Sequence, residues 1–524
     1  MHSDSGMMGC HEGMAGCDQG MMQGSPAGFL PAQGKDVSQI PEAKATSVLE
    51  VKDGETITIN PELVRTTING KSVPVYAYSG QFPGPTIKVK QGSTFTVNVT
   101  NNIDVPTTIH WHGIRIENKF DGTAGLTQEA IEPGKSFTYT VKVPDEGMFW
   151  YHPHVREDLQ QDLGLYGNLW VTPKNATAYS PVDREEVLTL DDMLLEGGLP
   201  VVYGAKEANY ALMGRFGNTM LVNGKTDYSL SIPRGSVVRY YLTNTANTRT
   251  FNVRFGNATM KLVGGDAGRK EREEVVDSVI LSPSERAIVE VQFTNAGTYK
   301  IESVSAMRTW LLGTVTALES GTEKDSDTSV QKNADVTADI DTFRSFFGKP
   351  VDKTIRLTVE SRMMDMMQQG SAQGMDHGAH GNMASHSDDG VEWEDPMPHM
   401  NSMSMKGNTT WKLIDEESGK ENMDIRYQFK VGDKVKIRIV NDTEADGSDH
   451  PMHHPIHFHG QRFLVLAIDG KSTDNLVWKD TVLVPTGKTV DILLDITNPG
   501  DWMFHCHIAE HLTNGMMGMF TVTK

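Results

Sequence analysis

The sequence IKVKQGSTFTVNVTN at residues 87–101 decides the fold, because the same pattern occurs twice more along the chain. Residues 230–244 read LSIPRGSVVRYYLTN, and residues 427–441 read YQFKVGDKVKIRIVN. Each stretch is an alternating strand, a turn glycine and a second alternating strand that ends at asparagine. The glycine and the asparagine are nine residues apart in all three. Alternation with period two indicates half-buried strands, so the repeat predicts three similar β-sandwich units.

A second pattern closes each unit. A turn before a strand falls at Gly134, Ser284 and Gly487, and a later turn that opens the last strand falls at Gly147, Gly297 and Gly500. Five residues after the later turn come His152, Glu302 and His505. Generic Greek-key patterning would explain the strands, but it would not explain histidines at matching positions.

The middle unit departs from the other two at these positions. It has Phe251-Asn252-Val253 roughly where the first unit has His110-Trp111-His112, and Glu302 where the others have histidine. We therefore expect metal ligands in the first and last units only. The metals would lie between these two units, and the middle unit would hold them in register.

Few stretches have helical periodicity, and alternating β-branched segments broken by Gly, Pro and Asn are many, so the fold class is all-β. We place unit one at residues 46–176, unit two at 177–322 and unit three at 350–524. Residues 1–45 are expected to be a flexible tail rich in Met, Gly, Cys and His. Residues 323–349 are acidic and polar, which indicates a linker.

Composition limits the partners and the location. The net charge of -20 argues against nucleic acid or an anionic membrane as partner, and the chain lacks the run of about 18 apolar residues that a membrane span needs. A monomer is expected. The residues after Met1 show no basic and apolar leader, so we expect a periplasmic or secreted protein whose signal peptide has been removed. Besides Cys506, the chain has Cys10 and Cys17, which could pair, bind metal or stay free.

The string His505-Cys506-His507 near the C-terminus is the strongest chemical signal, and His511 and Met516 follow it. Alternate side chains of a strand point to opposite faces, so Cys506 faces one way and its two neighbours face the other. A metal on Cys506 would be joined to metals on these histidines by a few covalent bonds. The arrangement is suited to electron transfer.

Three further histidine motifs accompany this string: His110-Trp111-His112, His152-Pro153-His154 and the stretch HPIHFHG at residues 454–460. A single HxH pair is weak evidence for a metal, but four motifs with one cysteine are strong evidence. A thiolate with two imidazoles and a distant thioether favours blue copper, whereas zinc prefers four strong ligands. Cys506, His511, Met516 and one histidine from 454–460 would form this site, and eight imidazoles remain for about three more metals.

The motifs HWHG at 110–113, HPH at 152–154, HPIHFHG at 454–460 and HCHIAEHLTNGM at 505–516 resemble those of the multicopper oxidases. That family includes laccases, cuprous oxidases and bacterial copper-resistance oxidases, and the resemblance covers nearly the whole chain. It implies three cupredoxin-like Greek-key β-sandwich domains and four copper ions: one type 1, one type 2 and two type 3. It also implies an oxidoreductase that couples one-electron oxidation of a substrate to four-electron reduction of O2 to water.

The resemblance also implies a ligand set. The type 1 copper would be held by His454, Cys506 and His511, with Met516 as the axial ligand. The type 2 copper would be held by His110 and His457. One type 3 copper would take His112, His152 and His507, and the other would take His154, His459 and His505.

Delivery of protons to O2 needs an acidic group. Asp121, eleven residues beyond His110, matches the acidic residue that the family has near its cluster, although an aspartate that only forms a turn is the alternative. The family often has a second acidic residue directly after the last type 1 histidine. This chain has Leu512 there, and Glu510 lies on the other side of His511, so no second relay is assigned.

A segment rich in Met and His occupies about residues 363–405, inside unit three. Its methionines are interleaved with Gly, Ser, Asp and Gln, which cannot form a core, and thioethers prefer Cu(I). Some copper-handling oxidases of the family have such an insert beside an extra cuprous site. The positions that resemble this site here are Met364, Asp365, Asp449 and Met452.

These observations leave three functions open. The first is a cuprous oxidase that serves copper homeostasis and tolerance, with laccase-like activity on phenols. The second is a general laccase acting on phenols or aromatic amines. The third, a copper-storage protein without turnover, is disfavoured because storage needs neither the relay at Cys506 nor a complete set of cluster histidines.

Overall fold

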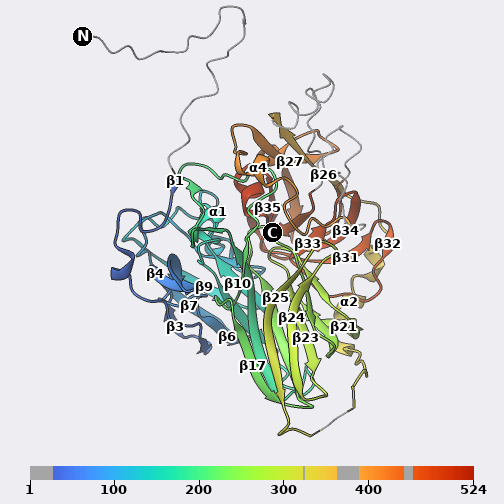
Figure 1. The fold of residues 1–524 in the computed structure, drawn as a ribbon. Helices are drawn as coiled ribbons and strands as arrows, with labels where there is room; N and C mark the ends of the chain where they lie inside the picture. Colours follow the sequence, from blue (N-terminus) through green and yellow to red (C-terminus); the bar gives the residue numbers. More distant parts are fainter. Residues whose placement is uncertain (1–27, 323–324, 363–388, 442–451) are drawn as a thin grey trace, which may run out of the picture.

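The structure is a computed structural model, and it describes residues 28–322, 325–362, 389–441 and 452–524 (Figure 1). Units one, two and three, coloured from blue to red along the chain, meet near the middle of the molecule. The chain is all-β with cupredoxin-like domains, as the sequence predicted. Within the described ranges, no helix is long and apolar enough to cross a membrane.

Unit one has a five-stranded sheet and a smaller partner sheet. The strand order is β2 (Val48–Val51), β6 (Thr86–Lys90), β11 (Gly167–Thr172), β10 (Gly147–His152) and β8 (His110–His112). The partner sheet is β3 (Thr56–Thr58), β7 (Thr94–Thr100) and β9 (Ser136–Lys142), and β4 (Pro61–Ile68) pairs with β5 (Lys71–Tyr78). The buried apolar residues of the two sheets belong to a core that continues into unit three, and β4 and β5 contribute to a smaller core as well.

Unit two repeats this arrangement. Its five-stranded sheet runs β17 (Tyr228–Pro233), β25 (Thr309–Leu318), β24 (Gly297–Val304), β19 (Phe251–Phe255) and β22 (Val279–Leu281). Its six-stranded sheet runs β16 (Thr219–Val222), β12 (Arg184–Met193), β18 (Val237–Asn244), β23 (Arg286–Gln292), β20 (Thr259–Gly265) and β21 (Gly268–Val276). It has a core of its own.

Unit three has the same two sheets. One runs β28 (Arg426–Lys430), β36 (Met517–Thr523), β35 (Gly500–Cys506), β30 (His454–Phe458) and β33 (Thr481–Val484). The other runs β27 (Thr409–Asp415), β26 (Lys353–Ser361), β29 (Lys434–Asn441), β34 (Lys488–Asp495), β31 (Arg462–Ile468) and β32 (Lys471–Ser472). The described helices are short: α1 (Glu157–Gln160), α2 (Ala334–Asp341), α4 (Pro398–Ser402), α5 (Ala509–Thr513) and the 3-10 turns η1 (Val37–Gln39), η2 (Asn118–Phe120), η3 (Arg344–Phe346) and η4 (Asn422–Asp424).

The asparagine that ends each repeat makes the same kind of hydrogen bonds in every unit. The side-chain amides of Asn101, Asn244 and Asn441 are buried, and each donates to two backbone carbonyls. Ser284 adopts φ 75°, the left-handed conformation that Gly134 (76°) and Gly487 (70°) adopt at the matching turns. The repeat in the sequence is therefore a repeat of backbone hydrogen bonding as well as of strands.

Replacing Asn244 by alanine tests this role. The change leaves the carbonyls of Arg249 and Leu281 buried without their donor, so we expect a loss of about 2–4 kcal/mol in the unfolding free energy. The shift in the urea midpoint measures it. Asn257, which is exposed in the same unit, is the control, and its replacement by alanine should cost under about 0.5 kcal/mol. Equal shifts for both variants would contradict the assigned role.

The pairing of strands corrects one equivalence. His152 lies opposite His110, and His457 lies opposite His505. In unit two the residue opposite Glu302 is Arg254, not a residue of Phe251-Asn252-Val253. Loops of unequal length hide this register in the sequence. Arg254 and Glu302 form an ion pair of 2.8 Å, so unit two has a salt bridge where the other units have two imidazoles.

Two segments expected to be flexible or to act only as connections are partly structured. Residues 28–45 of the tail are ordered because β1 (Gly28–Phe29) pairs with β15 (Tyr203–Gly204), and Ala32 and Ile40 are buried. The linker contains α2 and η3, because Ile340 and Phe343 pack into a small core with residues of unit three, including Trp478. The remaining two-residue strands are β13 (Leu195–Glu196) and β14 (Leu199–Pro200).

Candidate metal centres

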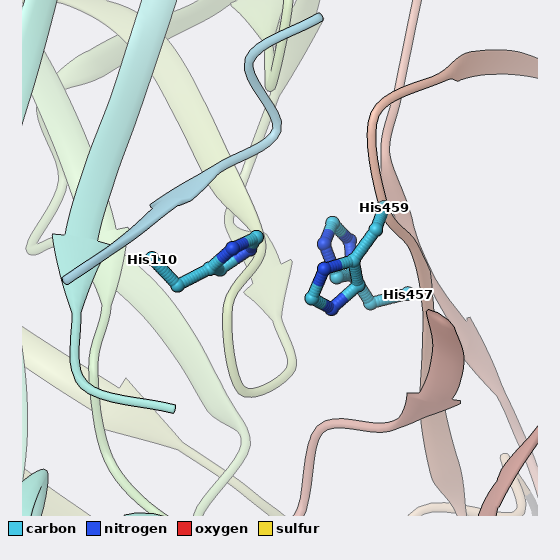
Figure 2. A group of neighbouring side chains, drawn as sticks. All are labelled: His110, His457 and His459. Carbon is cyan, nitrogen blue, oxygen red and sulfur yellow. The ribbon is translucent and has the colours of Figure 1, made fainter. Parts of the chain in front are cut away.

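Eight histidines meet where unit one faces unit three. Figure 2 shows three of them, with His110 from unit one pointing toward His457 and His459 from unit three. The others are His112, His152, His154, His505 and His507. Strand β8, strand β10 and the turn after β10 supply one half of the cluster, and strands β30 and β35 with the residues directly after them supply the other. None of the eight is more than 7% exposed, so the cluster is sealed from bulk water.

The histidines form overlapping groups whose ligand atoms lie within 4.8 Å of one another. These groups are His110 with His457 and His459, His110 with His112 and His152, and His154 with His459 and His505. The last group is the expected ligand set of one type 3 copper. His507 approaches the other pair more loosely, with its ring centroid 5.0 Å from that of His112 and 5.1 Å from that of His152.

Most of these imidazoles are held by one ring nitrogen. The Nδ1 atoms of His110, His152, His457 and His505 lie 2.7–2.9 Å from backbone carbonyls, and those of His154 and His459 lie 2.7 and 3.0 Å from the carboxylates of Glu157 and Asp121. Among the described residues, no partner reaches the buried Nε2 atoms of His110, His152, His154, His457 and His507. Holding one nitrogen orients the ring and leaves the other nitrogen for a metal, so the residues fit bound copper.

The pKa values of most cluster histidines favour the neutral imidazole, which agrees with a fit to bound copper. Burial, followed by the neighbouring imidazoles, holds the pKa values of His112, His152, His457, His505 and His507 well below the ordinary range. The same causes lower the pKa of His459 to about 3. Burial would also lower the pKa of His154, but Glu157 reverses the direction and raises it. Neutral imidazole is the form that binds a metal.

A second group surrounds Cys506. Its Sγ lies 3.5 Å from Nδ1 of His454 and 3.8 Å from Nδ1 of His511, and Met516 is fully buried in the same core. The indole ring of Trp411 stacks on His511 at 4.0 Å. Burial raises the pKa of the thiol far above its ordinary value, so a cation is needed to keep the thiolate form.

The two groups are neighbours through the backbone. Cys506 lies opposite Ile456 in the sheet, and His505 lies opposite His457, which belongs to the cluster. The Nδ1–H of His505 donates to the carbonyl oxygen of Cys506 over 2.8 Å. The thiolate side and the imidazole side of β35 are therefore connected by both covalent and hydrogen bonds.

Asp121 joins the two halves of the histidine cluster. Its Oδ2 lies 3.0 Å from Nδ1 of His459 in unit three, and its carbonyl oxygen lies 2.7 Å from Nδ1 of His110 in unit one. Thr123 donates to the same carboxylate. Burial would raise the pKa of Asp121, but His459 and His110 outweigh it and hold the pKa well below the ordinary range.

The second acidic residue that the family often has after the last type 1 histidine is absent here, and the neighbouring Glu510 contacts unit two. Leu512 is buried, and Glu510 hydrogen-bonds to Asn247 and Thr248 of unit two. Burial, reinforced by Asp158 and Asp162, raises the pKa of Glu510 to about 8.

Glu157 and Asp480, which touch His154 and His112, were missed because nothing in their local sequence separates them from ordinary acidic residues.

The candidate cuprous positions are only partly described. Met452 is fully buried, two residues before His454, and shares a core with Cys506 and Met516. Met364, Asp365 and Asp449, like Cys10 and Cys17, lie outside the described residues. The described end of the insert is well packed: Asn401 and Ser404 are fully buried, and they bond the backbone of residues 212–214.

A buried cysteine with two imidazoles, beside a cluster of imidazoles with open nitrogens, is the architecture of a copper-dependent oxidoreductase. Three matches to family models described as multicopper oxidase cover residues 49–176, 186–319 and 392–524, one in each unit. The chain belongs to the multicopper oxidase family, whose members use O2 as electron acceptor and oxidise reducing substrates.

Several relatives share most of their length with this chain. Multicopper oxidase mco of Staphylococcus aureus is 28% identical over 463 residues, which is 85% of this chain and 83% of the relative. A copper resistance protein A homolog of Pseudomonas syringae pv. tomato is 24% identical and covers 94% of both chains. A solved multicopper oxidase of Campylobacter jejuni, described as a metallo-oxidase, has a TM-score of 0.66 at 22% identity and covers 93% of this chain and 97% of that one.

Proposed function

We propose that the protein is a cuprous oxidase that serves copper tolerance and also oxidises phenols. In the overall reaction four Cu(I) ions each give one electron, and one O2 takes up four electrons and four protons to form two waters. The observation that carries the proposal is the pairing of the Cys506 site with the histidine cluster. The methionines of residues 363–405 and the buried Met452 favour Cu(I) as the electron donor, because thioethers prefer soft cuprous ions.

The ligand assignment is part of the proposal. His454, Cys506 and His511 would hold a type 1 copper with Met516 as the axial ligand. His110 and His457 would hold the type 2 copper. The two type 3 coppers would take His112, His152 and His507, and His154, His459 and His505. Four copper ions supply the redox chemistry when bound, while the protein orients the imidazoles, excludes water and brings protons through Asp121.

The location follows from the same chemistry. A protein that lowers the concentration of Cu(I) is useful where copper enters, so we propose a periplasmic or secreted enzyme that acts as a monomer. The copper resistance homolog of P. syringae agrees with a role in copper tolerance.

Oxygen uptake with two reductants tests the substrate. We compare Cu(I) and a methoxyphenol on the copper-loaded full chain and on a variant with serine at the six methionines of residues 363–388. The residues from 389 onward stay unchanged because they pack against unit two. We expect the rate at limiting Cu(I) to fall about tenfold or more while the phenol rate is kept, since lost ligands weaken capture of the metal.

The control replaces two exposed methionines outside the segment, Met307 and Met423, by serine, and should leave both rates unchanged. A variant that oxidises Cu(I) as fast as the parent would favour a general laccase. A copper-loaded chain that is colourless and takes up no O2 with either reductant would refute the proposal altogether.

A further inference from the structure

The side chain of Arg286, at the start of β23 in unit two, touches all three units. It is completely buried, with 0% of the side chain exposed. Its Nε donates to the carbonyl of Met148 in unit one over 2.7 Å, and its Nη1 donates to the carbonyl of Ser284 in its own unit over 2.7 Å. Its Nη1 and Nη2 both donate to the carboxylate of Asp480 in unit three, Nη1 over 2.8 Å. The fork geometry leaves Asp480 one orientation.

Asp480 in turn contacts two histidines of the cluster. Its Oδ1 lies 3.0 Å from Nε2 of His112, and its carbonyl oxygen lies 2.8 Å from Nδ1 of His457. The hydroxyl of Thr481 lies 3.1 Å from the same Nε2 of His112. These two histidines are assigned to different copper ions, so one residue bears on two metal positions.

His112 is held through the opposite ring nitrogen from six other histidines of the cluster, whose Nδ1 atoms contact carbonyls or carboxylates. Its Nε2 is engaged by Asp480, and among the described residues no partner reaches its buried Nδ1. In a neutral imidazole one nitrogen carries the proton and the other is the acceptor. A carboxylate at Nε2 selects the tautomer whose Nδ1 lone pair is free for a metal.

The approach of this carboxylate also explains the glycine that follows His112. Gly113 adopts φ 80°, and a Cβ built there would lie 2.2 Å from Oδ2 of Asp480 and 3.1 Å from Nη2 of Arg286. A side chain at this position would push the ion pair away from the cluster. The last residue of the HWHG motif is therefore shaped by the ion pair as well as by the turn.

The ion pair belongs to a larger charged network formed by protein side chains. Asp266 lies 3.7 Å from Arg286, and Lys479 lies 3.1 Å from both Asp266 and Glu285. Three carboxylates thus face two cations in a buried network. The orientation of Asp480 is accordingly built into the protein before any metal binds.

We propose that Arg286 is a positioning residue for the trinuclear copper cluster. It fixes Asp480, which sets the tautomer and orientation of His112 and, through its carbonyl, the ring of His457. Unit two, which has no copper ligand in the assignment, thereby contributes directly to the geometry of the cluster. The inference rests on the proposed function, because it requires copper at the eight histidines.

The test uses two variants of the full chain, Arg286→Lys and Asp480→Asn. Lysine keeps the charge but loses the fork, and asparagine keeps the shape but offers an N–H where His112 meets an acceptor. We expect the affinity for cluster copper to fall about 10- to 100-fold and the paramagnetic resonance signal of the type 2 copper to change, while the blue thiolate colour at Cys506 is kept. Copper per chain is counted after dialysis against a graded chelator.

Arg239→Lys is the matched control, because Arg239 is a buried arginine of the same unit that bonds Glu290 and Glu185 away from the cluster. It should lower the urea midpoint and leave copper content and signal unchanged. The proposal is overturned if both test variants behave like this control, or if they lose the blue colour together with the cluster copper. A parent chain without blue colour and O2 uptake would instead refute the proposed function.

Discussion

Replacing Cys506 by serine is expected to remove the blue colour and to lower O2 uptake with every reductant by about 10³-fold or more. The hydroxyl of serine is a poor copper ligand, and besides residue 506 the buried site offers the imidazoles of His454 and His511 and the weak thioether of Met516. The backbone and hydrogen-bond connection from residue 506 to His505 would remain, but no thiolate would join it to a metal. The histidine cluster does not use this side chain, so its copper should remain. Visible absorption, O2 uptake and copper content measure the three effects.

Met516→Leu is the control for this experiment. It would remove the proposed weak axial ligand and keep the cysteine and both imidazoles, so the variant should stay blue and active, with a changed reduction potential. If Cys506→Ser kept substantial O2 uptake, electrons would reach the cluster by another route. The assignment of the electron-entry site would then be wrong.

The candidate metal ligands could be picked out from the sequence because they lie in short local motifs. Cys506 and its neighbours alternate on one strand, and the asparagines that end the repeats carry out the same hydrogen bonding in all three units. Period-two geometry is a property of a few consecutive residues, so the sequence reveals it directly. Among the described residues, four of the five groups whose ligand atoms lie within 4.8 Å contain only residues of the four motifs that the sequence singles out, and the fifth adds Asp480.

The residues around the ligands could not be predicted, because their partners are distant in sequence. Asp480 meets His112 across 368 positions and Arg286 across 194, and neither pairing leaves a local pattern. The ion pair of Arg254 and Glu302 needs the strand register, which loops of unequal length conceal. The ordered tail and α2 were underestimated for a related reason: their few apolar residues pack only against surfaces formed by the rest of the chain.

Replacing Asp121 by asparagine is expected to slow the reduction of O2 by about 10²–10⁴-fold, the range for losing a positioned acid or base. Asparagine keeps an oxygen near Nδ1 of His459, and the backbone carbonyl of residue 121 still faces His110, so copper should be retained. Reductant should still bleach the blue colour at the normal rate without O2. On mixing with O2, the colour should return slowly.

Asp415→Asn is the matched control, since this buried carboxylate accepts hydrogen bonds from Tyr427 and Ser418 and not from a histidine of the cluster. It should leave the return of colour unchanged. Loss of cluster copper in the Asp121→Asn variant would mean that the carboxylate mainly positions His459. A normal return of colour with full copper would exclude a role of Asp121 in proton delivery. The variant differs from the parent only in the carboxylate, which is the group that would accept protons and pass them on toward O2.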